Sequence, residues 1–164
     1  MASSRVPSVR EMIFTSHSGP LKKTRHADWR YQQTFLTPLP QLEAYVAAIG
    51  EAHGGFLAAR LTVEQIVFDA DNLARFTAAS RTGEVVEGCS IDTKGQDETL
   101  GCLKAAFGDW IDFLFVPNPA RFAIYADHDE FTTFLSDSKA DVDSVRDLLK
   151  AKGFRHMEGY QRPS

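Results

Sequence analysis

The C-terminal third of the chain constrains the fold most strongly, because three strand-length apolar segments follow one another with only short polar turns between them. The segments are residues 110–116, 121–126 and 131–135, and the turns are Pro117-Asn118-Pro119 and Asp127-His128-Asp129. Strands joined by such short connections pair in antiparallel fashion, since a parallel pair needs a crossover of roughly a dozen residues. The pattern therefore predicts an antiparallel meander.

Four other segments carry the apolar spacing of helices together with helix start or stop signals. They span residues 37–54, 69–83, 97–108 and 138–153. The last is the clearest: Ser138 begins it as a capping residue, and an apolar stripe follows, made of Val142, Val145, Leu148 and Leu149. The sequence thus predicts about four helices.

The remaining segments resemble strands. Residues 29–35 alternate strictly, which places Trp29, Tyr31 and Phe35 on one buried face. Residues 56–68 form one long strand or two short ones, and residues 85–91 form another. We expect residues 154–161 to be a final strand parallel to the one before the last helix, because a helical crossover joins parallel neighbours. The predicted fold class is α+β (mixed α/β): a twisted mixed sheet that includes the C-terminal meander, packed by about four helices.

The chain length and composition indicate one domain. The 164 residues are 43% apolar and 24% charged, which is typical of a soluble globular protein. We assign residues 11–164 to a single globular domain and residues 1–10 to a flexible N-terminal arm. No apolar run approaches the roughly 20 residues of a membrane span, and no secretory signal is present. Cys89 and Cys102 are expected to remain thiols, and the expected location is cytoplasmic.

The net charge of −4 is distributed unevenly along the chain. Residues 1–35 hold six Lys/Arg and two Asp/Glu, whereas the remainder holds twelve Lys/Arg and twenty Asp/Glu. Acidic residues are densest between Asp127 and Asp147. Turn-forming and helix-capping roles explain many of these carboxylates, but a surface of one sign also attracts a partner of the other sign.

We interpret the chain first as a small soluble protein-binding module, an acidic inhibitor, antitoxin or immunity-type partner of a basic protein. The charged contacts would come from Asp127, Asp129, Glu130 and Asp137. Phe131, Phe134 and Tyr125 are the candidate aromatic anchors, provided that their rings are exposed. No cofactor is expected.

The alternative is a small enzyme with an acid–base or metal site assembled from distant residues, namely His128, His156, Asp112 and Glu158. Asp112 lies in a strand that is apolar on both faces, so it needs a partner, for which Arg121 and His156 are candidates. His128 is flanked by carboxylates. No local spacing typical of a metal site occurs, and we predict no metal.

A second alternative is a phosphate or nucleic-acid contact through the basic segment of residues 22–30, which holds Lys22, Lys23, Arg25 and Arg30. The acidic pI of about 5.7 and the lack of any nucleic-acid-binding motif make nucleic acid the weaker hypothesis. An edge strand near either terminus would also permit a homodimer.

Overall fold

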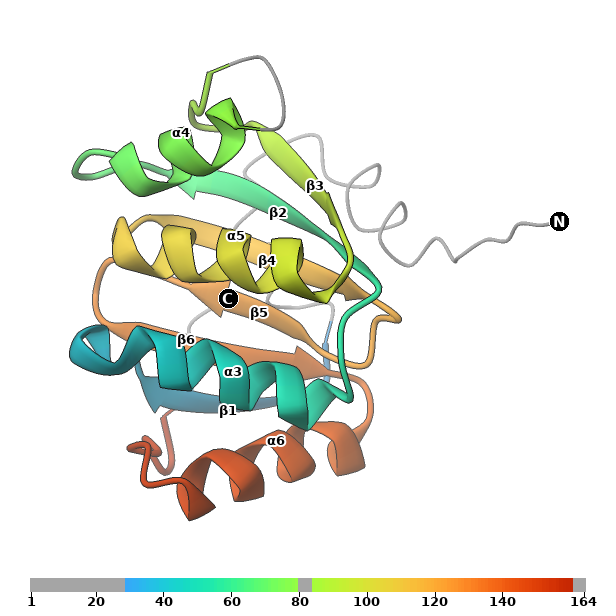
Figure 1. Ribbon diagram of the computed structural model, residues 1–164. Helices are drawn as coiled ribbons and strands as arrows, with labels where there is room; N and C mark the ends of the chain where they lie inside the picture. Colours follow the sequence, from blue (N-terminus) through green and yellow to red (C-terminus); the bar gives the residue numbers. More distant parts are fainter. Residues whose placement is uncertain (1–28, 80–83, 161–164) are drawn as a thin grey trace, which may run out of the picture.

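Six strands form one sheet in the computed structural model, which describes residues 29–79 and 84–160 (Figure 1). The order across the sheet is β1-β6-β5-β4-β2-β3. The strands are β1 (Tyr31–Leu36), β2 (Ala58–Gln65), β3 (Ser90–Lys94), β4 (Asp112–Asn118), β5 (Ala123–Ala126) and β6 (Phe131–Ser136). The helices are α3 (Leu42–His53), α4 (Asp71–Ala78), α5 (Gln96–Gly108) and α6 (Lys139–Ala151), with a short 3-10 turn at Leu39–Gln41.

The chain is a single α+β domain, as the sequence predicts, and β4, β5 and β6 form the expected antiparallel meander. The sheet is antiparallel rather than mixed, because every strand pair among the described residues is antiparallel. Of the strand predicted at residues 154–161, the described residues 154–160 form one antiparallel bridge, between Phe35 and His156, and residue 161 lies outside the described residues.

The position of the segment after α6 explains why its bridge is antiparallel and not parallel as predicted. The segment after α6 returns in the direction of β6, as the crossover rule requires. Its neighbour is β1 and not β6, and β1 runs antiparallel to β6. Two backbone hydrogen bonds hold the segment there, from the Leu36 N–H to the Arg155 carbonyl and from the Met157 N–H to the Thr34 carbonyl.

The four helices lie on the side of the sheet that faces the viewer in Figure 1. Their apolar stripes pack on strand side chains to form the main core, in which Phe35, Phe113 and Phe134 are fully buried. Alternate residues of β4, β5 and β6 form a smaller cluster on the other face: Leu114, Val116, Ala123, Tyr125 and Leu135. Trp29 packs against this second cluster, so it does not share the buried face of Phe35 as predicted.

Two helix ends follow the local signals in the sequence, and one helix start is stabilised by a residue from another element. Gly54 ends α3 at φ 86°, a left-handed conformation that favours glycine. The Ser138 hydroxyl accepts a hydrogen bond from the Asp141 N–H at 3.2 Å and thereby caps α6. At the start of α4 the capping residue, Ala70, has no side-chain oxygen. The buried Asp109 replaces it by accepting the Asn72 and Leu73 N–H groups at 3.0 and 2.8 Å.

Two boundaries differ from expectation. The strand predicted at residues 85–91 begins only at Ser90 as β3, and the residues before it form a turn beside the end of β2. Residues 56–68 contain a single strand, which is one of the two expected alternatives, but the strand ends at Gln65 and not at residue 68. Cys89 and Cys102 do not form a disulfide, as predicted. None of the helices described here is long and apolar enough to cross a membrane.

Candidate functional site

The turn between β5 and β6 exposes two of the four carboxylates that the sequence singles out. The side chain of Asp129 is 73% exposed, and Glu130 is exposed beside it at φ 79°. Asp127 is buried instead, and its Oδ1 accepts the Asp129 and Phe131 N–H groups at 2.9 and 3.3 Å. The role of Asp127 is therefore to fix the turn.

Asp112 and His128 are brought together at the same turn. Asp112, at the start of β4, is fully buried, and its Oδ1 lies 2.7 Å from His128 Nδ1. The same oxygen accepts the backbone N–H of His128 at 2.8 Å. The predicted partners of Asp112, Arg121 and His156, are wrong, because the turn after β5 folds back onto the start of β4.

The Asp112–His128 pair is the arrangement that orients an imidazole for proton transfer. The hydrogen bond to Asp112 raises the pKa of His128 above its ordinary value. Its Nε2 lies 3.7 Å from Asp129 Oδ1, so the outer side of the ring faces the exposed carboxylate.

His156 and Glu158, the other two candidate catalytic residues, lie elsewhere. His156 Nε2 lies 2.7 Å from Gln33 Oε1, beside β1, and burial lowers the pKa of His156. Glu158 is exposed after the bridge to β1. The structure therefore joins two of the four residues and separates the rest.

Asp137 lies at the opposite end of β6 from the Asp129 turn. Its Oδ1 accepts the Arg30 backbone N–H at 3.1 Å. It borders a cavity of about 360 Å³ that is also lined by Trp29, Arg121 and Asp141. Arg121 Nη2 lies 3.3 Å from Asp141 Oδ1, so the Arg121 guanidinium offsets part of the negative charge beside this cavity. The acidic residues of the C-terminal third are thus divided between two ends of the molecule.

Two of the three predicted aromatic anchors are fully buried. Tyr125 lies in the cluster on the second face and Phe134 lies in the main core, so their assignment as anchors is wrong. Phe131 is half-buried, with its ring 4.8 Å from the Tyr160 ring. The alternation along β5 explains the outcome for Tyr125, because it points away from the helices onto a face that is also buried.

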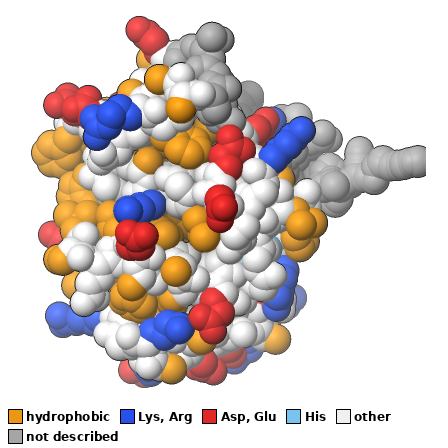
Figure 2. Space-filling view, in the orientation of Figure 1, with side chains coloured by type: hydrophobic (Ala, Val, Ile, Leu, Met, Phe, Trp, Pro, Cys, Tyr) orange, Lys and Arg blue, Asp and Glu red, His pale blue; other side chains and the backbone are white. Residues whose placement is uncertain are grey.

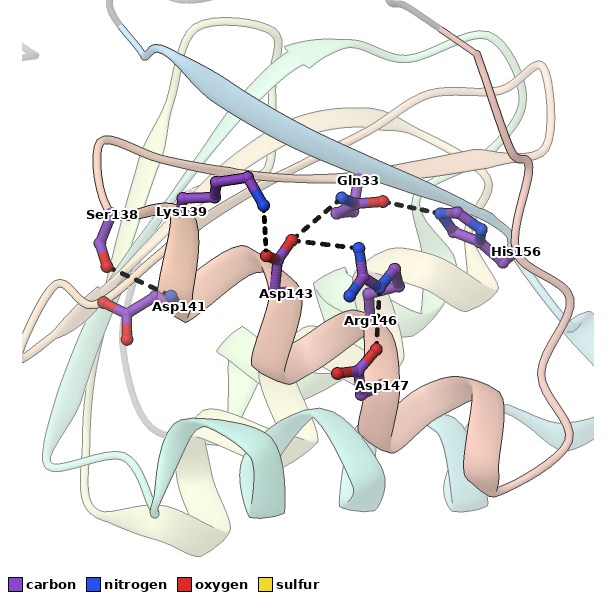
Figure 3. Close-up of polar contacts among 8 residues, drawn as sticks. All are labelled: Gln33, Ser138, Lys139, Asp141, Asp143, Arg146, Asp147 and His156. Atoms are coloured by element: carbon purple, nitrogen blue, oxygen red, sulfur yellow. Dashed lines mark hydrogen bonds and ion pairs between the residues drawn. The ribbon is translucent and has the colours of Figure 1, made fainter.

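Further carboxylates of the acidic region lie on α6, where neighbouring cations pair with them (Figure 3). Lys139 Nζ and Arg146 Nη1 lie 2.8 and 3.1 Å from the two oxygens of Asp143. Arg146 Nε lies 2.9 Å from Asp147, and Gln33 Nε2 donates to Asp143 from β1 at 3.5 Å. The contact with Lys139 lowers the pKa of Asp143. This paired network contributes little net negative charge to the surface.

Three residues of the proposed basic segment, Lys22, Lys23 and Arg25, lie outside the described residues, as does the predicted arm at residues 1–10. Arg30 is described: its guanidinium lies 5.6 Å from the centre of the Tyr31 ring. With Lys139 and Arg146 it borders a cavity of about 200 Å³ that also contains the carboxylate of Asp143.

An exposed apolar pair in the loop between β2 and α4 was not predicted from the sequence. Val67 is 41% exposed and Phe68 is 60% exposed. The prediction placed both in a strand, because residues 62–68 continue the apolar pattern of β2. The adjacent Asp69 and Asp71 were the available signal that the strand ends earlier.

Comparisons with protein-family models, with curated proteins and with solved structures found no match to this chain. Within residues 29–79 and 84–160, no three His, Cys, Asp or Glu side chains are placed to hold a metal ion. Function is therefore inferred from the geometry and charge of the molecule itself.

Proposed function

We propose that the protein is a binding module that docks onto a basic protein through the turn between β5 and β6, in the manner of an inhibitor, antitoxin or immunity protein. One observation carries this proposal: Asp129 and Glu130 are exposed on a turn whose backbone is fixed from inside. Asp127 accepts two N–H groups of the turn, and Asp112 accepts a third. Two buried carboxylates thus fix the backbone of the turn that carries the two exposed ones.

A turn fixed in advance suits recognition, because little conformational entropy is lost when a partner binds. Exposed charges of one sign accelerate encounter with a partner of opposite sign and set its orientation. The Glu130 carbonyl also accepts the Thr37 N–H at 2.8 Å, so the turn is tied to the chain after β1 as well.

The test is partner recovery from native lysate by affinity capture, read by mass spectrometry at low and at moderate salt. The double variant Asp129→Lys/Glu130→Lys is expected to recover the partner at least about tenfold less, which corresponds to about 1.4 kcal/mol. The matched control is Glu51→Lys/Asp97→Lys, which makes the same change in net charge on exposed residues of α3 and α5.

The proposal requires that the control recover a basic partner as the wild type does and that the partner dissociate as salt rises. Equal recovery by the wild type and the Asp129→Lys/Glu130→Lys variant, with unchanged circular dichroism, would refute docking through the turn.

The Asp112–His128 pair supports a second candidate function, an enzyme that moves a proton through His128. Its test is a screen of small-molecule substrates, in which any turnover should be abolished by His128→Gln and retained by Glu130→Lys. Turnover that persists in His128→Gln would remove this candidate.

A further inference from the structure

The loop between β2 and α4 places two large apolar side chains in solvent next to each other. Phe68 is 60% exposed and Val67 is 41% exposed. Single exposed apolar residues are ordinary, whereas adjacent ones commonly mark a contact surface. Val86, which is 47% exposed, belongs to the turn that runs beside the end of β2. Three exposed apolar side chains therefore lie near the end of β2.

The loop is also held in place at both sides. The Ile66 N–H donates to Glu87 Oε2 at 2.9 Å, which ties the start of the loop to the turn before β3. Asp109 accepts the Asn72 and Leu73 N–H groups and fixes the first turn of α4. Phe68 lies between these two attachments, so its position is set by the fold.

Exposed carboxylates lie beside the apolar pair in the loop and in the segment that is hydrogen-bonded to it. Asp69 and Asp71 follow it directly in the sequence and are exposed. Glu87 and Glu84 are exposed in the neighbouring segment, and Glu87 contacts Ile66 as described above. An apolar centre with an acidic border is complementary to an apolar recess with a basic border.

The loop and the acidic turn lie at the same end of the sheet. Gln65, at the end of β2, is opposite Asp112 at the start of β4, and Asp112 is hydrogen-bonded to His128 in the turn. Adjacent strands are about 4.8 Å apart, so the ends of β2 and β5, on either side of β4, are separated by roughly 10 Å. Figure 2 shows hydrophobic side chains gathered on the left of the molecule, the side on which β2 ends in Figure 1.

We infer that Val67 and Phe68 are the hydrophobic anchor of the docking surface and that the partner is a protein with an apolar recess bordered by Lys and Arg. This inference rests on the proposed function. It assigns to Val67 and Phe68 the anchoring role that the buried Tyr125 cannot have. A few buried aromatic side chains dominate the affinity of most interfaces, and the surrounding charges add specificity and speed.

The negative charges of the loop favour a basic protein over a second copy of this chain and over an anionic membrane surface. In a two-fold symmetric dimer of this chain, the acidic border would face its own copy, and like charges would repel. A membrane surface rich in anionic lipid would be repelled in the same way. The carboxylates favour a basic partner, and the apolar pair favours a partner with an apolar recess.

The test measures binding of two synthetic amphipathic peptides, one of leucine and lysine and the other of leucine and glutamate, to the full-length protein. The wild type is expected to bind the leucine–lysine peptide and not its counterpart. Phe68→Ser should weaken that binding at least about tenfold. The matched control is Leu57→Ser, because Leu57 is 71% exposed just before β2 starts, at the other end of the strand.

Each outcome is decisive. Loss of affinity in Phe68→Ser but not in Leu57→Ser, with unchanged thermal unfolding of both, supports the anchor. Wild-type affinity in Phe68→Ser overturns it. If Asp129→Lys/Glu130→Lys loses affinity while Phe68→Ser does not, the anchor fails and the proposed function stands. Equal binding of both peptides, or of neither, overturns the basic partner inferred for this loop, while partner recovery tests the acidic turn separately.

Discussion

At the scale of single residues, the burial of Asp112 determines how the acidic turn is built. A carboxylate removed from water is costly unless donors satisfy it, and Asp112 is fully buried. His128 supplies a ring nitrogen at 2.7 Å and a backbone N–H at 2.8 Å to one of its oxygens. The requirement for a partner was visible in the sequence, because Asp112 interrupts an apolar strand. The identity of the partner was not, because it depends on how the turn after β5 folds back.

The same contact predicts a pH dependence of stability. The hydrogen bond to Asp112 raises the pKa of His128 in the folded protein above its ordinary value of 6.5. The resulting stabilisation is therefore fully present below about pH 6.5 and is lost as the pH rises through the raised pKa. We expect the free energy of unfolding in urea to fall more between about pH 5.5 and about pH 9 in the wild type than in His128→Gln. Equal falls in the two proteins would contradict this assignment.

At the scale of elements, α4 illustrates a helix whose start is stabilised from outside. Its own capping residue is Ala70, and Asp109 accepts two of its first N–H groups from the connection between α5 and β4. Asp109→Ala leaves these donors without their acceptors and should lower the free energy of unfolding by about 1–2 kcal/mol. Urea unfolding measures the loss, and Asp109→Asn, which keeps one acceptor oxygen, should lose less. If Asp109→Ala is as stable as the wild type, α4 does not depend on this cap.

Elements whose ends carry local signals could be predicted from the sequence. Ser138 begins α6 and Gly54 ends α3, as their residue types indicate. The boundaries of β3 could not be predicted, because residues 85–89 have an apolar strand pattern but form a turn that bonds to β2 around Val63. The pairing of residues 154–160 also depends on the sheet order. Their bridge to β1 is antiparallel because β1, and not β6, is their neighbour. Tertiary placement overrides local pattern in both cases.

At the scale of the whole molecule, closeness in sequence does not make the acidic residues one surface. Asp129 and Asp137 are separated by the length of β6, and α6 pairs Asp143 and Asp147 with its own cations. The docking surface that we propose instead combines the loop after β2 with the turn after β5, which lie more than fifty residues apart in the chain. The turn could be named from the sequence, whereas the position of Val67 and Phe68 at the same end of the sheet depends on the sheet order.

The architecture also predicts that the molecule unfolds as one unit. The first described strand pairs with the last one, and Phe134 of β6 contacts the rings of Phe35 in β1 and Phe122 near β5. The two tryptophans report on separate places, Trp29 on the second face of the sheet and Trp110 in the connection before β4. In Trp110→Phe, which retains Trp29, urea unfolding followed by fluorescence should coincide with unfolding followed by circular dichroism, and the same should hold for Trp29→Phe. Two separate midpoints in either variant would show that the faces of the sheet unfold independently, because a single cooperative domain allows only one transition.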